Sequence, residues 1–169
     1  MRTRAKTLGA LFILSAFASV SMAQSDPFTG TWALDPVASN KEGKGYLVLI
    51  IDMTADREAY RNEFLLPDGT HEITRYRAAL DGKEHPSETI TTKPDGVTQV
   101  VRKDFVSVKK TGPRDEERRH TNPHVVVRRT VSADGNTLFS KVSSIDANGH
   151  EGPVTENLVF KRVSQTAQP

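Results

Sequence analysis

The sequence predicts an all-β protein with little helix, built as a single antiparallel up-and-down β-barrel of eight to ten strands. Five Asp-Gly or Asn-Gly dipeptides, which suit tight hairpin turns, lie at positions 68–69, 81–82, 95–96, 134–135 and 148–149. The segments between them include apolar, β-branched runs such as residues 46–51. So many strands in one domain favour a closed sheet, because open edges invite aggregation. A two-sheet sandwich is the alternative.

The first element in chain order is a secretory signal peptide over residues 1–23. Arg2, Arg4 and Lys6 precede a short apolar run over residues 8–20, and small residues follow it. Cleavage after Ala23 would leave residues 24–169 as one barrel domain. The basic count would then fall from 23 to 20, against 21 acidic residues, which gives no surplus for binding nucleic acid.

The apolar run is too short to span a bilayer, so no membrane span is expected. The chain has no Cys, which excludes a lipoprotein anchor, disulfides and Cys catalysis. We therefore expect a periplasmic or secreted protein.

Nine strands are expected after the signal, over residues 28–34, 45–54, 57–66, 70–80, 87–93, 97–108, 124–132, 136–145 and 154–163. A short turn over residues 35–39 follows the first strand, with Asp35 as its cap and Pro36 at its first position. The run from Pro113 to His120 mixes Arg with Asp and Glu. We interpret it as a solvated loop, with a mobile flap over the barrel mouth as the alternative.

The segment Phe28-Thr-Gly-Thr-Trp32-Ala-Leu34 resembles the first strand of the calycins, which include the lipocalins and the fatty-acid-binding proteins. The segment Val159-Phe-Lys-Arg162-Val resembles their last strand. This resemblance implies that Arg162 stacks on Trp32 and closes the barrel floor. The 13 residues between Trp32 and Tyr46 leave no room for the helical lid of fatty-acid-binding proteins.

The chain also resembles small exported bacterial lipocalin-like proteins of poorly defined function. Two further segments carry this similarity, Tyr76-Arg-Ala-Ala-Leu-Asp81-Gly82-Lys83-Glu-His-Pro86 and Ser132-Ala-Asp134-Gly135-Asn-Thr137-Leu138. The resemblance supports the barrel more than any particular ligand.

The barrel interior is the expected ligand site. Strand alternation points Arg129 inward with three valines, and an inward Arg needs an anionic partner. The candidate ligand-binding residues are Tyr60, Phe64, Tyr76 and Arg129, with Arg129 and Tyr76 facing an acidic head group as in the fatty-acid-binding relatives. The alternative, which we favour, places Arg129 at the mouth or in an internal pair with a glutamate such as Glu156.

We expect an exported, non-catalytic barrel that binds a small hydrophobic or amphipathic molecule, anionic ones included. The alternative is a filled barrel that acts as an envelope interaction or stress protein, and a barrel enzyme is a third reading. An interior cavity of ~300 Å³ or more would favour the binder. No catalytic residue, metal site or cofactor is assigned. Asn122-Pro123 keeps His120 and His124 from sharing a helix, which removes the helical spacing of zinc motifs. Ligand identity, oligomeric state and protein partners are not predicted.

Overall fold

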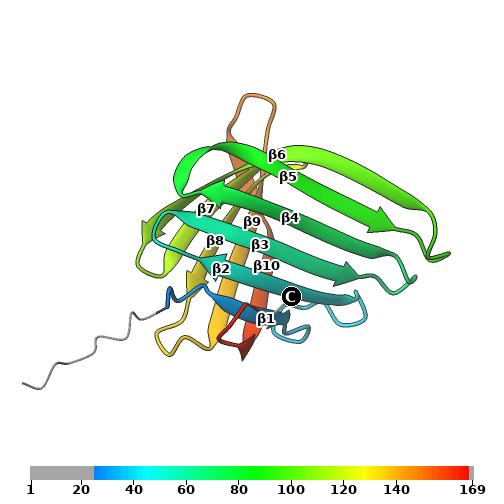
Figure 1. The fold of residues 1–169 in the computed structure, drawn as a ribbon, viewed down its shortest axis with the longest axis horizontal. Coiled ribbons are helices and arrows are strands. Elements are labelled where there is room, and N and C mark those ends of the chain that lie inside the picture. The colour runs from blue at the N-terminus through cyan, green and yellow to red at the C-terminus, as the bar shows by residue number, and fades with distance from the viewer. Residues whose placement is uncertain (1–24, 168–169) are drawn as a thin grey trace, which may run out of the picture.

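The computed structural model describes residues 25–167 as one closed antiparallel barrel, and the expected signal peptide lies outside the described residues. The ten strands are β1 (Gly30–Leu34), β2 (Tyr46–Met53), β3 (Arg57–Leu65), β4 (His71–Ala79), β5 (Asp81–Thr92), β6 (Gln99–Gly112), β7 (Asp115–Thr121), β8 (His124–Val131), β9 (Thr137–Ile145) and β10 (Glu151–Ser164). Each strand pairs with the next in sequence, and β1 pairs with β10 to close the ring (Figure 1). The predicted up-and-down barrel is therefore confirmed, and the sandwich alternative is wrong.

The predicted dipeptide turns all lie at the ends of neighbouring strands. Their glycines have φ angles between 72° and 85°, in the left-handed region that glycine adopts without a steric penalty. Residues 36–40 form the expected turn after β1, where the Ala38 N–H donates to the Asp35 carboxylate at 3.0 Å.

The charged run before His120 is a strand and not a loop, so both the solvated-loop and the flap interpretations are wrong. β7 pairs with β6 on one side and with β8 on the other. Glu116 and Arg118 point into the barrel and are buried, while Arg119 is exposed. Residues of the run point alternately into the barrel and towards its outer face, and each inward charge has an opposite charge inside the barrel. Two neighbouring boundaries also differ, because β5 begins at Asp81 and β6 continues to Gly112.

One end of the barrel, here called the floor, is closed by Trp32 and Arg162. Trp32 is fully buried, and the Arg162 guanidinium carbon lies 3.9 Å from the centroid of its ring. Arg162 also donates three hydrogen bonds of 2.6 Å to the carbonyls of Pro27, Thr29 and Gly135. These contacts tie β10 to the entry of β1 and to the β8–β9 turn.

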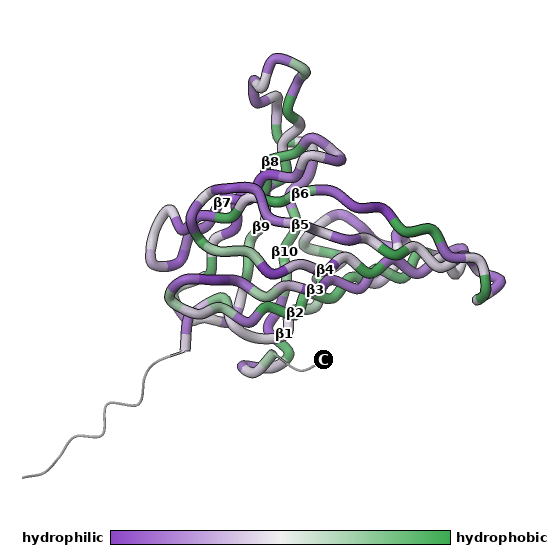
Figure 2. The backbone as a smooth tube through the Cα atoms, turned by 45° about the horizontal axis from the view of Figure 1, so that its top comes forward, coloured by the Kyte–Doolittle hydropathy of each residue, from purple (hydrophilic) through white to green (hydrophobic). Residues whose placement is uncertain are grey.

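The opposite end, here called the mouth, carries the hairpin between β5 and β6, which projects beyond the rest of the barrel (Figure 1). Val97, Val100 and Val101 on this hairpin are exposed, and hydrophobic stretches are visible on it in Figure 2. No helix among residues 25–167 is long and apolar enough to cross a membrane.

Candidate functional site

A cluster of buried charged groups lies across the middle of the barrel. Its members come from β3, β4, β7 and β8, and we call them the charged cluster: Glu58, Tyr76, Glu116, Arg118 and Arg129. Arg129 donates to Glu116 Oε1 and to Glu58 Oε1, each at 2.5 Å. Tyr76 donates to Glu58 Oε2 at 2.8 Å and accepts from Arg118 at 2.6 Å.

The charged cluster balances its own charge. Two arginines face two glutamates, and Arg118 Nε lies 3.4 Å from Glu116 Oε1. Burial raises the pKa of Tyr76 well above its usual range, so its hydroxyl stays protonated and donates to Glu58. Burial also raises the pKa of Glu116, and Arg129 and Arg118 oppose that rise. Such an ion-pair network holds strands together, since a buried charge is costly unless it is paired.

Two stacked tyrosines connect the charged cluster to the space above it. The rings of Tyr60 and Tyr76 are stacked with centroids 4.8 Å apart. The Arg118 guanidinium lies over the Tyr60 ring at 4.4 Å, a favourable cation–π distance. Arg118, which belongs to the charged cluster, and Tyr60 therefore separate the rest of the cluster from the mouth side of the barrel.

A cavity of about 220 Å³ occupies the barrel on the mouth side of Arg118 and Tyr60. It reaches the exposed β7–β8 turn at Asn122 and Pro123, so it opens at the mouth. The volume is below the usual ~300 Å³ of drug-sized sites and above the ~150 Å³ that holds benzene in an engineered cavity. The interior is thus neither filled nor large.

The lining of this cavity divides into two contiguous walls. The apolar wall comes from β2, β8, β9 and β10, and consists of Leu47, Leu49, Val125, Val127, Val142, Leu158 and Phe160. The polar wall comes from β3 to β7, and consists of Asn62, Thr74, Thr89, Arg102, Asp104, Arg118 and His120. Ser140 is the polar exception on the apolar side. The cavity is therefore amphipathic across its width.

Two titratable groups on the polar wall have shifted pKa values. Burial, helped by Arg118, Arg129 and Arg102, lowers the pKa of His120 to about 3, so its imidazole is neutral at pH 7. Burial raises the pKa of Asp104, and the Ser87 side chain and the Arg102 charge oppose that rise. Asp104 is 9% exposed, and its Oδ1 atom has no hydrogen-bond partner within residues 25–167.

The four predicted ligand-binding residues fall in three places. Tyr60 lines the cavity, whereas Tyr76 and Arg129 lie in the charged cluster on its floor side. Phe64 is half-buried on β3 nearer the mouth. Arg129 has the internal partners of the favoured alternative, but they are Glu58 and Glu116, since Glu156 pairs with Lys41 at 2.8 Å.

Sequence reasoning missed the polar wall. Asp104 and Arg102 are two residues apart on a predicted strand, so strand alternation could have placed them on one face with Val106. Arg118 and His120 show the same alternation, hidden by the interpretation of residues 113–120 as a loop. Their charge made the strand look like a solvated segment.

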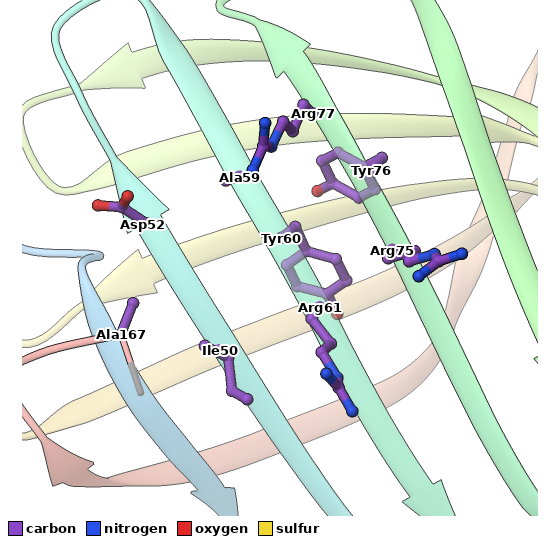
Figure 3. Close-up of a pocket in the computed structure, with 9 residues that line it drawn as sticks. All are labelled: Ile50, Asp52, Ala59, Tyr60, Arg61, Arg75, Tyr76, Arg77 and Ala167. Carbon is purple, nitrogen blue, oxygen red and sulfur yellow. The ribbon is translucent and has the colours of Figure 1, made fainter. Parts of the chain in front are cut away.

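A larger hollow of about 520 Å³ lies on the outer surface of β2, β3 and β4 (Figure 3). Arg61, Arg75 and Arg77 line it, and alternation places them on the face opposite Tyr60 and Tyr76. Arg61 pairs with Glu63 at 2.7 Å and Arg75 with Glu88 at 2.7 Å. With two of its cations already paired, this hollow is a weaker candidate than the enclosed cavity.

The fold and the cavity together define a closed antiparallel barrel with an amphipathic interior site. Comparisons of the chain with protein-family models, with curated proteins and with solved structures found no match. Among the described residues, no three His, Asp or Glu side chains gather in a way that could hold a metal ion.

Proposed function

We propose that this protein is an exported, lipocalin-like carrier that binds a small amphipathic molecule inside its barrel. The observation that carries the proposal is the division of the cavity into an apolar wall on β2 and β8–β10 and a polar wall on β3–β7. A ligand lying across the cavity would bury its hydrocarbon part against valines and leucines and its polar group against β6 and β7. Binding sites combine mostly apolar lining with a few placed polar groups in this way.

The size of the cavity limits the ligand. A space of about 220 Å³ suits a molecule of roughly ten non-hydrogen atoms, such as one ring with a short chain, given that ~150 Å³ holds benzene. Long-chain lipids would extend out of the mouth. The expected affinity is modest, because small ligands bury little area.

Export and family membership are part of this proposal. The charged n-region, apolar run and small residues of positions 1–23 support export, and the short segments at Trp32 and Arg162 support a lipocalin-like origin. The mass of the protein recovered from the periplasm of a Gram-negative host tests export, and it should correspond to residues 24–169.

The proposal is tested by closing the cavity without changing the fold. Four probes share a phenylpropyl skeleton of suitable size: phenylpropyl alcohol, phenylpropylamine, phenylpropanoate and propylbenzene. We expect at least one of them to bind residues 24–169 in calorimetric titrations. Val142→Phe places a ring in the cavity and should weaken that binding about tenfold or more, since overpacking costs ~1–3 kcal/mol.

The matched control is Lys141→Phe, because Lys141 is the exposed neighbour on the opposite face of β9. It adds the same ring outside the barrel and should leave binding unchanged. Native mass spectrometry on protein purified gently from the periplasm would then give the mass of any natural ligand. If none of the four probes binds, or if both variants bind equally well, the interior site is not the functional site.

A further inference from the structure

On the polar wall, Asp104 Oδ1 makes no hydrogen bond within residues 25–167, and the hydroxyl of Ser87, its cross-strand neighbour on β5, makes none either. Asp104 points into the cavity from β6 and is nine-tenths buried. A carboxylate accepts hydrogen bonds and donates none when ionised. A buried acceptor left unpaired destabilises a protein, so an occupant that supplies a donor is favoured.

The arginines near Asp104 either contact residues of the charged cluster or lie closer to the mouth. Arg118 contacts Tyr76 and Glu116, and Arg129 contacts Glu58 and Glu116. Arg102 is exposed towards the mouth. A ligand carboxylate at the depth of Asp104 would lie beside the Asp104 carboxylate, which repels it.

The same surroundings disfavour a ligand cation. Arg102 and Arg118 line the same wall as Asp104, so a ligand cation beside Asp104 would also lie near two positive charges. Neutral His120 lines the same wall and offers a second uncharged polar contact.

We infer that the polar group of the ligand is an uncharged hydrogen-bond donor, a hydroxyl on an alcohol or phenol, which donates to Asp104 while the hydrocarbon part packs on the apolar wall. This inference rests on the proposed interior site and specifies its ligand class. It separates the protein from a carrier of carboxylates, in which a free arginine would serve as the anchor.

The four phenylpropyl probes test this inference, since they differ only in the head group. Phenylpropyl alcohol should bind about tenfold more tightly than propylbenzene, because a site with a buried acceptor rejects an analogue that lacks the donor. The amine and the carboxylate should each bind more weakly than the alcohol. Tighter binding of either ion, or equal binding of the alcohol and propylbenzene, would overturn the inference while leaving the interior site in place.

Variants at Asp104 link the preference to this residue. Asp104→Leu removes the acceptor with a side chain of similar shape, and the tenfold preference for the alcohol over propylbenzene should fall to about one. Asp104→Asn keeps an acceptor oxygen and removes the charge, so the alcohol should keep most of its preference while phenylpropanoate binds more tightly than to the parent protein. A preference that survives in Asp104→Leu would also overturn the inference.

Lys103→Leu is the matched control, since Lys103 is the exposed neighbour on the outer face of β6. It should leave all four affinities unchanged. Circular dichroism of each variant verifies the fold, and propylbenzene, which needs no donor, reports whether the cavity is intact. If the parent protein binds none of the four probes, propylbenzene included, both the inference and the proposed function are overturned.

Discussion

At the scale of single residues, the interior of this barrel contains charge where a small barrel usually contains hydrocarbon. Arg129 is completely buried, and it forms ion pairs with Glu58 and Glu116. Glu58 and Arg129 are 71 residues apart in the chain, so their contact ties β3 to β8 across the barrel. A strand pattern can predict an inward arginine, but it cannot identify a partner at that distance.

Replacement of Arg129 should therefore affect folding before it affects any ligand. Arg129→Met leaves Glu58 and Glu116 buried without their common partner, and breaking a buried pair in this way costs ~3–5 kcal/mol. Urea unfolding followed by fluorescence of Trp32, which is the single Trp of the chain, measures the change.

Arg128→Met is the control for this variant, because Arg128 is the next residue and its carboxylate partners, Glu117 and Glu151, lie on the outer face. Pairs involving an exposed side chain contribute ~1 kcal/mol or less, so the control should lose little stability. Equal losses for the two variants would show that the charged cluster does not stabilise the barrel as described.

At the scale of elements, turns were easier to predict from the sequence than strands. Asp-Gly and Asn-Gly carry their own backbone preference, so the five turns that contain them could be placed from local residues alone. β7 could not, because its Glu116 and Arg118 are inward only by virtue of partners on β3, β4 and β8. For the same reason the candidate site was predicted as the barrel interior with Tyr60, Phe64, Tyr76 and Arg129, without Asp104 and His120.

Hydrogen exchange distinguishes a central strand from a loop at β7. The amides of residues 116–120 should exchange slowly, since β7 is paired on both sides. Amides of residues 95–97, in the exposed turn between β5 and β6, should exchange quickly in the same sample. Comparable fast exchange in both segments would contradict the assignment of β7 as a strand within the barrel.

At the scale of the whole molecule, closure depends on a short strand. β1 has five residues, yet it must pair with both β2 and β10 to complete the ring. Arg162 reinforces this junction through Trp32 and three carbonyl groups. The floor is thus held by one side chain of β10 that contacts both the β1 region and the β8–β9 turn.

Arg162→Lys should loosen the floor although it keeps the charge. Lysine cannot reproduce the planar guanidinium that stacks on Trp32 and donates in three directions. We expect a loss of about 2 kcal/mol in the free energy of unfolding, from unpaired carbonyls, and a red shift of Trp32 emission as water reaches the ring. Lys161→Met, on the exposed face of β10, should change neither quantity; an unchanged Arg162→Lys variant would contradict the role of this contact.

Both ends of the described chain leave the barrel on the floor side, where Ser25 and Gln165 line the same surface hollow as Arg162. The mouth lies at the other end of every strand. Immobilising the protein on a sensor chip through either end would therefore orient all molecules with their openings towards the solution. A fluorescent reporter attached near His124, beside the opening, would sit where an entering compound passes, so the same scaffold could be converted into an oriented optical sensor.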